Sequence, residues 1–102
     1  MGPHLKQAFK YIGNTLYRDD GKPHTIAKMR VTYNRIIAPE IRGKAARKYA
    51  KRLVLVWDDL IMCGTSLADR EQAARLLIRL DEGLIALQTM MSVEEKKKED
   101  LR

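Results

Sequence analysis

The chain has 102 residues, of which 45% are apolar and 32% are charged, and its formal net charge at pH 7 is +7. A chain of this length suits one domain that folds without disulfide or metal support. This composition excludes a disordered chain, and the absence of an apolar run of about 18 residues excludes a membrane-spanning helix. The N-terminus lacks the apolar segment of a signal peptide and there is a single Cys, so we expect an intracellular protein.

The first predicted helix covers residues 3–17. Apolar residues recur there at three- and four-residue spacing from Leu5 to Leu16, which places them on one face of a helix. The connection at residues 18–24 contains Asp, Gly and Pro, which favour a turn. Because this connection is short, we expect the second helix to run back along the first.

The second predicted helix begins at Thr25, whose side chain can cap a helix by accepting a backbone hydrogen bond. Its apolar face includes Ile26, Met29 and Tyr33. Pro39 disfavours the helical conformation at the residue before it. We therefore expect a break at that point, with Pro39 in the first turn of the third helix.

The third predicted helix spans residues 41–63 and has two different halves. In the first half, basic residues lie opposite an apolar face that includes Ala45 and Tyr49. The second half, around Trp57, is apolar on nearly every side, which is typical of deep core or of an interface. The apolar residues on the side where charges lie two turns earlier are Val54, Leu55, Ile61 and Met62.

The fourth predicted helix follows Gly64, which is expected to end the third helix in a left-handed conformation. Ser66 and Asp69 predict a capping box at the start of the fourth helix. Its apolar residues repeat at alternating four- and three-residue spacing from Ala73 to Met91. This repeat covers less than three full heptads, so it is more typical of one wall of a bundle than of an isolated coiled coil.

The C-terminal residues are polar. Ser92 is expected to act as a second cap, and residues 93–102 to form a solvated helical extension or a frayed tail. The predicted fold is all-α, a mostly antiparallel four-helix bundle in one domain over residues 1–92.

Positive charge is concentrated between Lys28 and Arg52. Nine basic residues and one acidic residue give this segment a charge of +8, and the rest of the chain sums to −1. A local excess indicates a polyanion or an acidic partner, although Lys and Arg are also common on helices for propensity and solubility. Phosphate contacts would give affinity without sequence specificity. The predicted nucleic-acid-binding residues are Arg35, Arg42, Lys44, Arg47, Lys48, Lys51 and Arg52.

The alternative hypothesis is a helical protein-interaction module. Two surfaces together offer more apolar area than a small bundle can bury. They are the apolar second half of the third helix, with Val54, Leu55, Ile61 and Met62 as interface candidates, and the wide apolar face of the fourth helix. Such a surface would serve self-association or the docking of a partner helix. The basic residues would then attract an acidic protein.

Catalytic and metal chemistry are not indicated. His4, His24 and Cys63 are far apart in the sequence and have no metal-ligand spacing. Cys63 is expected to be a buried structural thiol. Asp58 and Asp59 are adjacent, and adjacent residues of a helix do not face each other. No glycine-rich phosphate loop or Ser/His/Asp set is present. We therefore predict a binding protein with no catalytic residues, metal, cofactor or small-molecule substrate.

Overall fold

The computed structural model of the chain describes residues 1–18 and 22–101. These residues contain no strand, so the all-α prediction is confirmed. The π-helical segment η1 (Tyr33–Ile37) and the 3₁₀ turn η2 (Ala38–Glu40) follow the second helix directly. The α-helices are α1 (Pro3–Arg18), α2 (Pro23–Thr32), α3 (Lys44–Ile61) and α4 (Leu67–Asp100).

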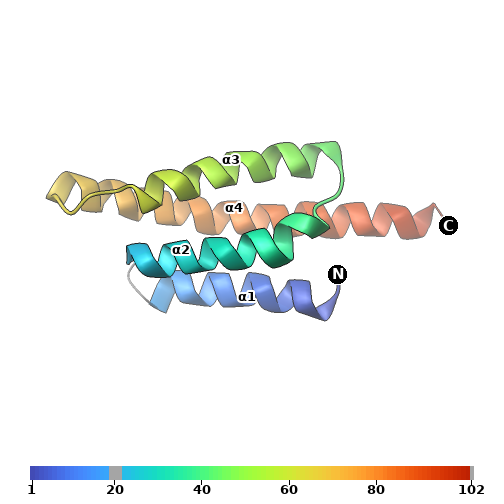
Figure 1. Ribbon diagram of the computed structural model, residues 1–102. Helices are drawn as coiled ribbons and strands as arrows, with labels where there is room; N and C mark the ends of the chain where they lie inside the picture. Colours follow the sequence, from blue (N-terminus) through green and yellow to red (C-terminus); the bar gives the residue numbers. More distant parts are fainter. Residues whose placement is uncertain (19–21, 102) are drawn as a thin grey trace.

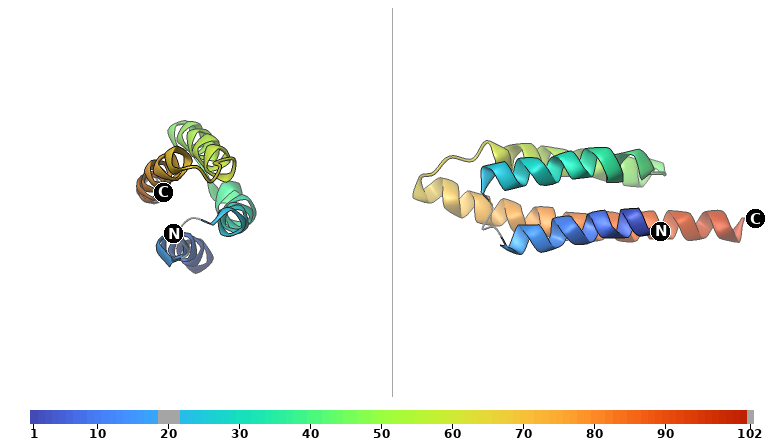
Figure 2. Two further views of the ribbon diagram at one scale, coloured as in Figure 1. Left: turned by 90° about the vertical axis from the view of Figure 1, so that its left-hand side faces the viewer. Right: turned by 60° about the horizontal axis from the view of Figure 1, so that its bottom comes forward.

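The helices lie side by side and alternate in direction along the chain (Figure 1). The end-on view of Figure 2 shows them arranged around a common centre, in the order α1, α2, α3, α4. The most extensive contact is between α3 and α4, and α1 contacts both α2 and α4. The last turns of α4 project beyond the other helices (Figure 1). None of the described helices is both long enough and apolar enough to cross a membrane.

Trp57 and Tyr33 lie in the core and join α3 to the end of α2. Both side chains are buried, and their ring centroids are 5.1 Å apart at an interplanar angle of 50°. The indole Nε1 of Trp57 donates a hydrogen bond of 3.1 Å to the carbonyl oxygen of Ile26. A buried indole needs such a partner, because an unpaired polar group in the core costs free energy. Tyr33 is buried on the predicted apolar face of its helix, and Trp57 lies in the core, one of the two places expected for this half of the third helix.

The π-helical segment carries the chain through the point where a break was predicted. Met29, Tyr33 and Ile37 are all buried, and their four-residue spacing would drift around an α-helix of 3.6 residues per turn. The wider turn of η1, closed by the amide of Ala38 on the carbonyl of Tyr33, offsets this drift. Pro39 then lies in η2, so its predicted place in the first turn of the third helix is wrong.

α3 begins at Lys44 rather than Ile41, because Gly43 before it has a φ of 90°. Side chains disfavour this conformation, and glycine adopts it readily. The space is also restricted there: a Cβ at Gly43 would lie 3.2 Å from the Cδ of Glu94 on α4. The helix therefore starts where Gly43 turns the chain beside α4.

The buried face of α3 differs from the predicted one at its start. Ala45 is exposed, whereas Ala46 and Ala50 are buried, so the predicted inward position of Ala45 is wrong. The reason is that α3 has two neighbours. Trp57 bonds to α2, and Leu53 packs against α4, so the buried face points between those two helices.

α2 begins at Pro23, so the prediction that Thr25 is its N-cap is wrong. Lys22 occupies the cap position without a side-chain hydrogen bond, and Thr25 is buried inside the helix. Proline suits the first helical turn because its missing N–H would have no partner there. Thr25 is therefore a buried residue within α2 and not the cap of this helix.

The connection between α3 and α4 contains the predicted capping box. The amide of Asp69 donates to the Oγ of Ser66 at 3.1 Å, and the amide of Ser66 donates to the Oδ2 of Asp69 at 3.4 Å. The predicted left-handed conformation of Gly64 is wrong, since Gly43 is the only described glycine with a positive φ. Gly64 instead leaves room for the capping carboxylate, because a Cβ there would lie 2.6 Å from that Oδ2.

α4 is a single helix of 34 residues that includes most of the predicted extension. The predicted apolar face is confirmed from Leu80 to Met91, whereas Leu77 is half-buried and its neighbour Leu76 is buried. The predicted second cap is wrong. Ser92 lies inside the helix, where its Oγ donates to the carbonyl of Gln88 at 3.0 Å.

Candidate nucleic-acid interface

The outer face of α3 carries five basic side chains in its first half, and all of them are exposed. Lys44, Lys48 and Lys51 share one line, because residues three and four apart lie on the same side of a helix. Arg47 and Arg52 lie on either side of this line. We call Lys44, Arg47, Lys48, Lys51 and Arg52 the basic stripe.

No residue of the basic stripe forms an ion pair with any other residue that the structure describes. The first turn of α3 also contains no acidic residue. Cations are unfavourable at this end of a helix, because the aligned peptide dipoles make it partly positive. Helix stability therefore does not explain why Lys44, Arg47 and Lys48 lie at the start of α3.

Arg35 and Arg42 lie away from the basic stripe. Arg35 is exposed on η1. The guanidinium of Arg42 folds back on its own backbone, where Nη1 donates to the carbonyl of Pro39 at 2.7 Å and to that of Ile41 at 3.2 Å. Of the seven predicted nucleic-acid-binding residues, α3 brings five together, and Arg42 points into a different region.

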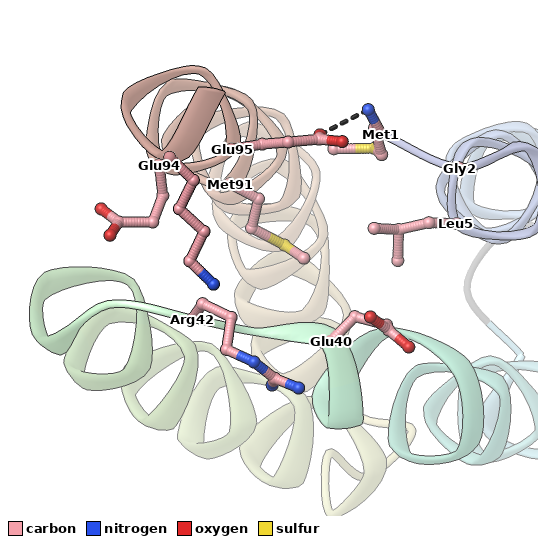
Figure 3. A pocket seen from close by; sticks show the side chains of 9 residues that line it. Met1, Gly2, Leu5, Glu40, Arg42, Met91, Glu94 and Glu95 are labelled. Atoms are coloured by element: carbon pink, nitrogen blue, oxygen red, sulfur yellow. Dashed lines mark ion pairs between the residues drawn. The ribbon is translucent and has the colours of Figure 1, made fainter. Parts of the chain in front are cut away.

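That region is a hollow of about 230 Å³ at the end of the bundle (Figure 3). Glu40, Glu94 and Glu95 line it together with Arg42 and Lys98. Glu95 forms an ion pair with the terminal ammonium of Met1, drawn as the dashed line in Figure 3. The other carboxylates of this hollow would repel a phosphate, so we do not place a polyanion there.

A second concave feature, a groove of about 360 Å³, lies between η1 and α3. Its apolar lining is buried or half-buried, while Asn34, Arg47 and Lys51 are exposed at its edges. No acidic residue is among the described residues that line this η1–α3 groove. The apolar lining consists of Tyr33, Ala38, Ile41, Ala50 and Val54.

Farther along α3, one of its two carboxylates is paired. The Nη2 of Arg30 lies 2.9 Å from the Oδ1 of Asp58, whereas Asp59 is exposed. The Nε of Arg30 is buried and has no hydrogen-bond partner among the described residues. Burial raises the pKa of Tyr33 nearby, and the positive charge of Arg30 acts in the opposite direction.

The predicted interface residues divide into two pairs. Val54 and Ile61 are half-buried against the core. Leu55 and Met62 remain 64% and 82% exposed on the outer face of α3. A helix of 3.6 residues per turn places residues seven apart on nearly the same line, so only this second pair is available to a partner.

The His and Cys side chains do not lie together in one site. His4 and His24 are exposed in the first turns of α1 and α2. Cys63 is half-buried against the core after α3, less buried than predicted. Within residues 1–18 and 22–101, no three His, Cys, Asp or Glu side chains are placed to hold a metal ion.

The η1–α3 groove, whose lining includes Asn34, Ala38 and Ile41, was not predicted from the sequence. A π turn has no residue signature of its own. The available signal is the four-residue spacing of the buried residues Met29, Tyr33 and Ile37. Comparisons of the chain with protein-family models, with curated proteins and with solved structures find no match.

Proposed function

We propose that this protein binds the phosphate backbone of nucleic acid through the basic stripe on α3. The observation that carries this proposal is a row of five exposed cations on one helix, with no ion pair to any described residue. Lys44, Arg47 and Lys48 lie near the partly positive start of α3, where a cation brings no gain in helix stability. Basic residues that contact phosphates supply affinity, and they contribute no sequence preference directly.

The proposal predicts a steep dependence on salt. Each phosphate contact releases counterions, so five contacts on a duplex would give a log–log salt slope of about −4.5. Affinity should therefore fall strongly between ~50 mM and ~200 mM salt. Fluorescence anisotropy with a labelled random-sequence duplex and a labelled single strand measures this slope.

A pair of matched variants tests where the contacts are. Replacing Lys44, Lys48 and Lys51 by Gln should weaken binding and make the duplex salt slope shallower by about 2.7. The control replaces Lys96, Lys97 and Lys98 by Gln, which removes the same charge from the exposed end of α4. Equal losses in the two variants, or no measurable binding by the wild-type protein at ~50 mM salt, would contradict the proposal.

The second candidate function is protein interaction, and it depends on exposed apolar side chains. Leu55 and Met62 project from α3, and Ile78 and Ile85, each 59% exposed, project from α4. Exposed apolar patches of this kind mark interaction sites when they are contiguous. Self-association or an acidic helical partner would cover one of these surfaces.

Light scattering coupled to size-exclusion chromatography tests this second candidate. If α3 forms the contact, the wild-type protein should elute as an oligomer, and Leu55→Glu with Met62→Glu should convert it to a monomer. Ile78→Glu with Ile85→Glu gives the matching test for α4. A wild-type monomer that binds nucleic acid would count against self-association.

A further inference from the structure

We propose that the η1–α3 groove holds an unpaired nucleobase, so that this protein binds single-stranded nucleic acid in preference to duplex. The inference rests on the proposed function, because the basic stripe supplies the phosphate contacts. The basic stripe and the groove share two residues. Arg47 and Lys51 belong to the basic stripe and also line the groove.

The lining of the groove suits the face of a base. Ala38 and Ala50 are small, and Ile41 and Val54 complete an apolar surface beside Tyr33. A nucleobase is flat and largely apolar on its faces, and contact with such a surface gains free energy without selecting a sequence. Tyr33 is itself buried against Trp57, so it forms part of the apolar wall and does not project as a stacking platform.

The polar groups at the edges suit the rest of a nucleotide. Asn34 is exposed on η1, and its carboxamide has both donors and an acceptor for the edge of a base. On the α3 side, Arg47 and Lys51 offer cations for the phosphate attached to that base. A nucleotide joins an apolar ring, a polar edge and an anion in one unit, which is the combination that the groove presents.

Only an unpaired base can use this site. In a duplex the faces of the bases are covered by stacking and their edges are paired, so a base must be unstacked before it enters a pocket. Duplex DNA would therefore contact the basic stripe alone. The predicted preference for single strands follows from this difference.

The charge around the groove favours a base over an acidic helical peptide. The apolar lining ends at Val54, and the next turn of α3 carries Asp58, paired with Arg30. An acidic helix needs a longer apolar strip for anchors at i, i+3, i+4 and i+7, and it would meet this carboxylate. A single base fits within the short apolar lining.

The experiment compares three labelled probes by fluorescence anisotropy at one salt concentration. They are a single strand of about 12 nucleotides, an abasic strand with the same number of phosphates, and the corresponding duplex. We expect the base-containing strand to bind at least about tenfold more tightly than the abasic strand. The duplex should bind more weakly than the base-containing single strand, and duplex binding of equal or higher affinity would overturn the inferred preference for single strands.

Two variants and one control locate the effect. Asn34→Ala and Ala38→Leu should each reduce the ratio of single-strand to abasic affinity, and leave abasic binding unchanged. Ala45→Leu, at an exposed position of α3 away from the groove lining, should preserve the ratio. Blue-shifted emission from Trp57, the single Trp, confirms folding of each variant.

Each outcome has a defined meaning. Equal affinity for the base-containing and abasic strands overturns this inference but leaves backbone binding intact. Failure to bind any probe at ~50 mM salt overturns the proposed function as well. A base preference that both groove variants retain also overturns the inference. The same holds if the groove variants instead abolish binding of an acidic amphipathic peptide while no base preference exists.

Discussion

The two halves of α3 use the same helix for different purposes. Residues 44–52 fully bury only the small side chains Ala46 and Ala50, with Tyr49 half-buried against the core, and expose the uncompensated basic stripe. Residues 53–61 bury Trp57 and other large side chains, and one of their two carboxylates, Asp58, is paired with Arg30. Buried apolar side chains are therefore concentrated in the second half, and positive charge in the first.

This difference shows how a short bundle can keep a charged surface available. On the α3 side, the small side chain of Ala50 lines the η1–α3 groove, with Arg47 and Lys51 beside it. The second half secures the position of the helix through the bond from Trp57 to the backbone of α2. Because the second half holds α3 in place, the first half can bury less apolar surface.

The largest effect should come from the second half. Trp57→Ala should lower the free energy of unfolding by about 3–5 kcal/mol, because it leaves a cavity and removes the hydrogen bond to Ile26. Leu55→Ala, on the exposed side of the same half, should change it by less than about 0.5 kcal/mol. Urea denaturation measures both. A similar loss in the two variants would show that stability is spread over α3 and not centred on Trp57.

The contact of this half with α4 gives the next test. At Gly83 a Cβ would lie 2.2 Å from the Cδ2 of buried Leu53, so Gly83→Ala should destabilise the protein. Overpacking costs about 1–3 kcal/mol, and the gain in helix propensity of about 1 kcal/mol offsets part of it. The control is Gly13→Ala in α1, where no atom lies within 4 Å of an added Cβ. That variant should be more stable than wild type by about 0.5–1 kcal/mol.

A smaller effect is expected at Tyr33, which separates the groove from Trp57. Burial raises the pKa of Tyr33 in the folded state. The contribution of this pKa difference to the free energy of unfolding is therefore fully present below about pH 10. It is lost as the pH rises through about 10 towards the raised value, since the unfolded chain ionises first. Tyr33→Phe should therefore lose less stability than wild type between about pH 8 and about pH 10.5 in urea denaturation. Equal losses of stability in the wild type and in Tyr33→Phe would show that ionisation of Tyr33 does not cause the alkaline loss.

The smallest effect on folding should come from the first half. Replacing Lys44, Arg47, Lys48 and Lys51 by Glu changes the net charge from +7 to −1, since each substitution removes two charge units. Thermal and urea unfolding should change little, because these side chains are exposed and the start of α3 favours acidic residues. Binding to nucleic acid should be lost. A variant that keeps full binding would show that the basic stripe is only a solvated face.

Much of the fold follows from local patterns in the sequence. The spacing of apolar residues predicts α1 nearly to its ends, and the capping box at Ser66 and Asp69 predicts the start of α4. The inward positions of Trp57 and Tyr33 also follow from periodicity. The candidate site was predicted in part. Periodicity places five basic residues on the outer face of α3. It does not predict that Arg42 lies in the hollow lined by Glu40, Glu94 and Glu95.

The sequence by itself determined the helical class, most of the core positions and the basic stripe, because these depend on periodicity and capping between near neighbours. Tertiary structure alone decided the π turn at Tyr33–Ile37, the late start of α3 and the pairing of Arg30 with Asp58. Each of these depends on how α2, α3 and α4 pack together, which brings together groups that are distant in the sequence. The η1–α3 groove is a product of that packing, so the proposed nucleobase site became visible only in the folded chain.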